Sequence, residues 1–255
     1  IAYEAGSWEG YMEKLLSSTA AGMAPDVFWM GAEFVPDLAP LGALLPLTEY
    51  AEADPLWWDD YLRPAREDLT WRGDIYGIPQ LLSGRAVVYR KDFFAEAGLD
   101  QEKGPDTWQD LIDYAVKLTK RDSTGRITRA GFDDDWGTGS PTQLWMHFVL
   151  QSGGQLFSTD ELTKETKVRY NDAAGVRATE FYKGWFQTWK FSVAGAMPHL
   201  AGLSGLVLDT AAMSYMTYGV IMNAKMYKPE IEPKLGLWWD TRMSPFTPRA
   251  HQVFA

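Results

Sequence analysis

The sequence predicts an α/β protein built of two lobes, and three observations support that prediction. Residues 7–30 show an amphipathic helical pattern followed by a short apolar run, which is typical of a helix leading into a buried parallel strand. Residues 171–189 show a long helical pattern with an aromatic face, which we expect to be core. Between them, residues 73–99 contain a turn, a strand and a short helix in succession. We interpret this stretch as the crossing from one lobe to the other and expect a ligand to bind there.

Composition limits the classes of function that fit. The chain has 255 residues, of which 46% are hydrophobic, enough for one large or two modest cores. A net charge of −10 argues against binding to nucleic acid or to an anionic membrane surface, and we interpret it as a solubility feature. The chain has no cysteine and three widely separated histidines, so neither a metal site nor a cofactor is expected.

Aromatic residues are unusually frequent. Twelve tryptophans, twelve tyrosines and twelve phenylalanines make 14% of the chain. Tryptophan and tyrosine combine a flat apolar face with a polar tip, which suits sugar rings. The alternative is that a large α/β protein simply buries these side chains, and composition leaves both explanations open.

The first segments predict a helix, a strand and a loop acid. Ser7 is the expected N-cap of a helix that ends near Gly22. The run 25–30 is expected to be a buried strand, followed by a loop that contains Glu33. Ligands of open α/β sheets bind outside the carboxyl ends of strands, so Glu33 is a candidate ligand contact. An ordinary solvated acid is the alternative.

The crossing and the segments after it have clear end signals. A strand is predicted over 85–89 and a helix over 90–98, with Gly98 as its C-cap. A further helix should begin at Asp106 or Thr107. Later strands are expected over 207–213, with Tyr218 beyond its end, and over 235–240. His147 lies in an apolar helix and has no partners nearby in the sequence that suggest catalysis.

Residues 133–139 hold the densest group of acids, three consecutive aspartates followed by Trp136. The spacing of a calcium-binding EF-hand loop is not met. A carboxylate pair for glycoside hydrolysis and a plain solvated loop both remain open. A third interpretation is that one or two of the acids accept ligand hydrogen bonds while Trp136 stacks.

Several segments together resemble the extracellular solute-binding proteins of bacterial ABC importers, in the carbohydrate-binding branch that includes maltose-binding protein. They occur in the family's order along nearly the whole chain. The matching segments are residues 14–29, 41–47, 73–99, 104–111, 151–157 and 209–219.

The resemblance implies two lobes that close on a sugar at a hinge, without covalent chemistry and therefore without enzyme activity. Residues 1–82 would form lobe 1, residues 83–238 lobe 2, and residues 239–255 would return to lobe 1. Relative to the family, the first strand and helix of lobe 1 and the usual C-terminal helices are missing, so the resemblance implies a fragment of a longer protein. The implied partner is a membrane permease, and a monomer that is periplasmic or extracellular, either free or lipid-anchored, is expected.

The resemblance also implies ligand contacts at particular positions. Glu33 matches a loop acid that accepts sugar hydroxyls, and Tyr218 matches an aromatic platform. The crossing strand and the acidic cluster would line the cleft, and one tryptophan lies beside the return hinge. The full implied set is Glu33, Gln80, Ser83, Arg85, Asp134, Asp135, Trp136, Tyr218 and Trp239.

The leading functional hypothesis is therefore a protein that captures a sugar or oligosaccharide and delivers it to a permease. A glycoside hydrolase that uses Glu33 or the aspartate cluster is the first alternative. The second alternative keeps the binding fold but changes the ligand. The acids would then select an amine or amino sugar, or Arg85 would select a phosphate or uronate.

Overall fold

The computed structural model describes residues 10–133, 141–160, 165–194, 203–238 and 253–254. The chain divides into two compact units, residues 1–82 with 254–255 and residues 83–253. The predicted return of residues 239–255 to the first lobe stays a prediction, since 239–252 lie outside the description. None of the helices in the described residues has the length and apolar character that a membrane span needs.

The first unit is mainly helical and has a small core. Its buried cluster consists of Ala32, Val35, Ala39 and Leu69. Its two short strands pair with each other in antiparallel fashion. The elements are α1 (Tyr11–Ala20), η1 (Ala32–Phe34), α2 (Val35–Leu38), η2 (Ala39–Leu41), α3 (Thr48–Ala53), α4 (Pro55–Asp59), α5 (Arg63–Asp68), β1 (Thr70–Trp71) and β2 (Asp74–Ile75).

Two predictions for the first unit are not met. Helix α1 begins after Gly10, which adopts a left-handed φ of 71° at the N-cap, and Ser7 lies outside the described residues. Residues 25–30 form no strand, with a bend at Asp26 and Val27, and Val27 is 88% exposed. A strand needs a neighbour for its backbone groups, and no described strand pairs with these residues.

The second unit is an α/β unit around one sheet. The sheet has the order β10–β3–β8, and β9 also pairs with β3. The elements are β3 (Ser83–Arg90), α6 (Lys91–Glu96), α7 (Trp108–Leu118), β4 (Lys120–Arg121), β5 (Ile127–Arg129), α8 (Pro141–Gln151), β6 (Phe157–Thr159), β7 (Thr166–Val168), α9 (Ala173–Gln187), β8 (Met213–Thr217), α10 (Gly219–Tyr227), η3 (Glu232–Lys234), β9 (Leu235–Trp238) and β10 (Val253–Phe254).

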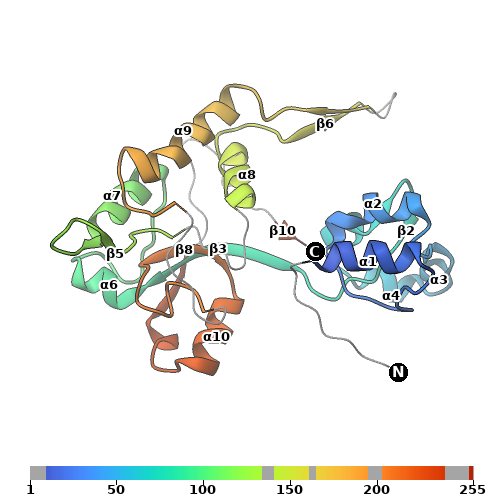
Figure 1. Ribbon diagram of the computed structural model, residues 1–255, viewed down its shortest axis with the longest axis horizontal. Coiled ribbons are helices and arrows are strands. Elements are labelled where there is room, and N and C mark those ends of the chain that lie inside the picture. The colour runs from blue at the N-terminus through green and yellow to red at the C-terminus, as the bar shows by residue number, and fades with distance from the viewer. Residues whose placement is uncertain (1–9, 134–140, 161–164, 195–202, 239–252, 255) are drawn as a thin grey trace. The chain divides into compact units, whose positions relative to one another are not determined.

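Helices cover both faces of this sheet. Figure 1 shows α8 and α9 on one side of β3 and β8, with α10 on the other. Alternate strand residues explain this arrangement, because neighbouring side chains of a strand point to opposite faces. Val87 and Tyr89 belong to the large aromatic core cluster that also contains Trp185, whereas Val88 packs in a cluster with Val220 of α10.

The helix ends in this unit follow local sequence signals. The Asp110 amide donates to Thr107 Oγ1, and the Thr107 amide donates to the Asp110 carboxylate, which completes a capping box at α7. Asp172 caps α9 by accepting from two backbone amides. The C-cap of α6 is Ala97 rather than the predicted Gly98, which follows it with a left-handed φ of 65°.

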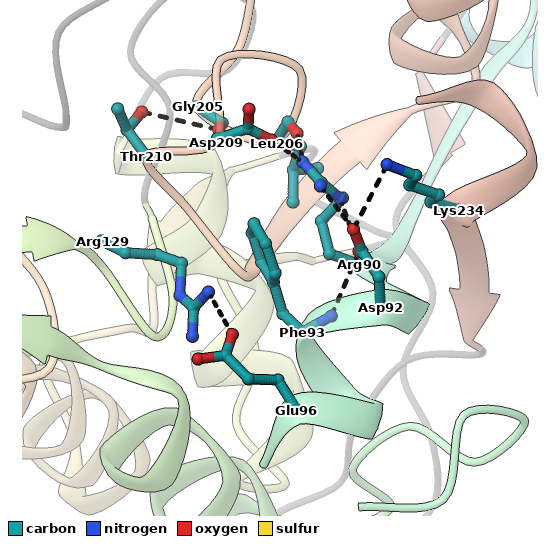
Figure 2. Close-up of polar contacts among 10 residues, drawn as sticks. All are labelled: Arg90, Asp92, Phe93, Glu96, Arg129, Gly205, Leu206, Asp209, Thr210 and Lys234. Atoms are coloured by element: carbon teal, nitrogen blue, oxygen red, sulfur yellow. Dashed lines mark hydrogen bonds and ion pairs between the residues drawn. The ribbon is translucent and has the colours of Figure 1, made fainter. Parts of the chain in front are cut away.

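Arg90 joins three segments at the end of β3, as Figure 2 shows. Its side chain is 2% exposed and makes a bidentate ion pair with Asp92, at 2.8 and 2.7 Å. Its Nη1 donates to the carbonyl of Leu206, at 2.8 Å, and to the carboxylate of Asp209. The guanidinium also lies 4.0 Å from the centroid of the Phe93 ring, and this cation–π contact further stabilises the buried arginine.

The contacts of Arg90 with Asp92, Leu206 and Asp209, which we call the clamp, explain why the predicted strand over 207–213 is wrong. Residues 205–209 form a turn, and β8 begins only at Met213. Arg90 holds the carbonyl of Leu206 and the side chain of Asp209, which itself adopts a left-handed φ of 63°. The run is apolar because Leu206 and Val207 are core residues of the turn, each 0% exposed.

The clamp predicts a specific pH dependence. Partial burial alone would raise the pKa of Asp92, but the hydrogen bonds and positive charge of Arg90 outweigh it and lower the pKa below 3.8. A lowered native pKa contributes stability above the unfolded pKa, and that stability is lost as pH falls through the native value. We expect the free energy of unfolding to fall less steeply between pH 5 and 2 in Asp92→Asn than in the parent. Denaturant titrations at each pH measure this, and parallel slopes would refute it.

Candidate functional site

The carboxyl end of β8 lies at one end of the second sheet, which we call the site edge. Residues 130–133 run parallel to this part of the chain, with Ala130 bridged to Ala211 just before β8 and Asp133 bridged to Ser214 near its start. The antiparallel strand β3 begins at the same edge, because Arg85 is in register with Thr217 at the end of β8. Ligands of α/β sheets bind outside such carboxyl ends, so this edge is the candidate site of the second unit.

Two of the predicted residues, Arg85 and Tyr218, lie at this edge. Arg85 is half-buried, and its Nη2 donates to Oε1 of Gln143 on α8, at 2.9 Å. Tyr218 follows β8 directly and is 55% exposed, so its ring is open to solvent. The structure therefore places a set of guanidinium donors and an exposed aromatic ring at the same end of the β3–β8 pair.

Tyr215 of β8 and His147 of α8 form a buried polar pair near this edge. The hydroxyl of Tyr215 lies 3.3 Å from Nδ1 and 3.4 Å from Nε2 of His147. His147 is 0% exposed, and Tyr215 is also buried. A histidine enclosed in this way beside a tyrosine is a packing residue, as expected from the sequence, because a catalytic base must reach a substrate.

The remaining predicted residues lie in the first unit, at the start of β3, or outside the described residues. Glu33 lies in η1 and is exposed, and Gln80 is exposed between β2 and β3. The backbone of Ser83 begins β3. Asp134, Asp135, Trp136 and Trp239 lie outside the described residues. The structure therefore tests neither the positions nor the contacts of these last four residues, and their roles stay predictions.

The first acid of the cluster is the one that the structure describes. Asp133 is 0% exposed, its amide donates to the carbonyl of Met213 at 2.8 Å, and its own carbonyl accepts from the hydroxyl of Ser214 at 2.8 Å. It fixes the end of its segment against β8. Asp133 is thus not part of a solvated acidic loop.

A groove of about 300 Å³ lies at the other end of β3. Its lining includes Tyr89, Lys91, Glu102 and Trp238, and Lys91 spans to Glu102 with N–O distances of 2.8 and 2.9 Å. Burial raises the pKa of Tyr89 to about 12, with Glu102 and Asp100 adding to the effect. Of the predicted ligand contacts that the structure describes, none lines this groove.

Sequence reasoning missed Gln143. Its signal was present, because Gln143, His147 and Gln151 recur every four residues in an otherwise apolar helix. Such spacing puts the three on one face of α8. Sequence alone does not show whether that face is solvated or buried, and the structure shows that it contacts β3, β8 and α7.

A family model described as bacterial extracellular solute-binding protein matches residues 1–242. The diacetylchitobiose binding protein DasA of Streptomyces coelicolor is 25% identical over 186 residues, which are 72% of this chain and 40% of that protein. The sn-glycerol-3-phosphate-binding periplasmic protein UgpB of Escherichia coli K12 is 50% identical over 46 residues, 18% of this chain and 10% of that protein.

Solved structures show the same fold. A solute-binding protein from Thermotoga lettingae bound with α-D-tagatose superposes with a TM-score of 0.82 at 23% identity. The match covers 96% of this chain and 60% of that one. The chain thus spans about two fifths of the length of curated relatives such as DasA. The predicted α/β solute-binding fold is confirmed.

Proposed function

The chain belongs to the bacterial extracellular solute-binding proteins, and from that membership we propose that it captures a sugar or oligosaccharide and delivers it to an ABC-transporter permease. Members of this family bind transport substrates in the periplasm or outside the cell and are not enzymes, which removes the glycoside hydrolase alternative. The sugar and the permease remain proposals for this chain.

One observation carries the choice of ligand: Arg85 and Tyr218 lie at the same end of the β3–β8 pair. A guanidinium can donate two parallel hydrogen bonds to neighbouring sugar hydroxyls. The exposed ring of Tyr218 can stack on the C–H face of the same sugar. Glu33 and Gln80 are exposed in the first unit, where their carboxylate and amide would accept hydroxyl hydrogens.

Two of the comparisons support a carbohydrate. DasA is named for diacetylchitobiose, and the similar structure from Thermotoga lettingae holds α-D-tagatose. A second candidate ligand is a phosphorylated glycerol, which the 50% identity to part of UgpB favours. Arg85 suits that ligand as well, because a guanidinium binds phosphate in bidentate fashion.

A thermal-shift screen of the protein separates these ligands. The panel is maltose, mannobiose, D-tagatose, N,N′-diacetylchitobiose and sn-glycerol 3-phosphate. We expect one of the neutral sugars, at about 100 times its Kd, to raise the melting temperature by about 5–10 °C, because it binds only the folded state. A shift with sn-glycerol 3-phosphate alone would support the second candidate. No shift with any of the five would contradict the proposed function.

A further inference from the structure

Helix α8 carries a row of three polar side chains, Gln143, His147 and Gln151, which we call the polar seam. They lie on one face of the helix, four residues apart. Each contacts a different element, since Gln143 accepts from Arg85 of β3, His147 meets Tyr215 of β8, and Gln151 accepts from Nε1 of Trp108 at 2.6 Å. The seam therefore fixes the rotation of α8 against both the sheet and α7.

Burial changes along the seam. Gln151 and His147 are 0% exposed, whereas Gln143 and its partner Arg85 are half-buried at the candidate site. Polar contacts in a low-dielectric interior permit few alternative arrangements, because a shifted helix would leave polar atoms unsatisfied. The two inner contacts thus hold α8 so that the amide of Gln143 is fixed at the site edge.

We propose that Gln143 is a positioning residue that holds Arg85 for ligand binding. Its amide oxygen takes one N–H of the guanidinium at 2.9 Å and restricts the long, flexible arginine side chain. Less rotamer freedom is then lost when a ligand binds. Because the amide is neutral, it orients the guanidinium without offsetting its positive charge. This inference rests on the proposed role of Arg85 as a ligand contact.

A double-mutant cycle tests the proposal, with Kd measured calorimetrically for the panel compound that gives the largest thermal shift. Gln143→Leu keeps the size of the side chain but removes the acceptor, and we expect it to weaken binding about tenfold. Because Gln143 acts through Arg85, the same change in an Arg85→Leu background should alter Kd by less than about twofold. Gln143→Glu restores an acceptor at the same place and should return the Kd for a neutral sugar to within about threefold of the parent.

Gln187 is exposed at the end of α9, so Gln187→Leu should leave both Kd and melting temperature unchanged. If Gln143→Leu weakens binding equally with and without Arg85, the residue acts by another route and the inference fails. If Gln143→Glu binds a neutral sugar as weakly as Gln143→Leu, the inference also fails. If Arg85→Leu binds normally, the proposed ligand contact itself is wrong and the inference falls with it.

Discussion

Arg90→Met should lower the free energy of unfolding of the second unit by about 2–4 kcal/mol. Methionine keeps much of the apolar stem but removes every hydrogen bond to Asp92, Asp209 and the carbonyl of Leu206. The two carboxylates are 34% and 54% exposed, so water compensates them partly and the loss stays below that of a fully buried pair.

The neighbouring residue provides a matched control. Lys91 forms an ion pair with Glu102 at 2.8 Å, but Glu102 is 76% exposed. Lys91→Met should therefore cost less than about 1 kcal/mol. Urea denaturation followed by circular dichroism measures both variants. Equal losses in the free energy of unfolding would contradict this prediction, because they would show that burial does not make the contacts of Arg90 more stabilising than an exposed ion pair.

Gly131→Ala should destabilise the second unit by about 3 kcal/mol or more. A Cβ atom built at Gly131 would lie 1.8 Å from the backbone oxygen of Ala115 in α7. A backbone atom inside a helix cannot rotate away, and Ala115 is itself 0% exposed. The helix or the 130–133 segment would have to move, and that segment is bridged to β8 through Asp133 and Ser214.

Gly84→Ala is the control for the loss of glycine itself. A Cβ at Gly84 meets nothing within 4 Å, and its backbone does not require glycine. We expect this variant to be neutral or more stable by about 0.4–1 kcal/mol, because alanine restricts the unfolded chain. If Gly131→Ala proves as harmless as Gly84→Ala in the same denaturation experiment, the close approach to α7 is wrong.

Elements that depend on neighbours in the sequence were predictable. The capping box at Thr107, the Asp172 cap and the left-handed Gly98 are each formed within a few residues. The strand at the crossing was also predictable from its β-branched and aromatic residues. β3 is longer than the predicted strand by two residues at its start and by one at its end.

Elements that depend on distant partners were not predictable. The turn before β8 is fixed by Arg90, 116 residues from Leu206. Residues 25–30 have the composition of a strand, yet composition does not supply the neighbour that a strand requires. At the candidate site, Arg85 and Tyr218 followed from the resemblance. Gln143 did not, because its role depends on the rotation of α8 about its own axis.

A crystal structure of the protein with the selected panel sugar tests the central claim most directly. We predict that the sugar lies at the end of β3 and β8, with a guanidinium nitrogen of Arg85 about 3 Å from a hydroxyl oxygen and the ring of Tyr218 against its C–H face. A sugar bound elsewhere, such as in the groove beside Lys91, with neither residue in contact, would contradict the account.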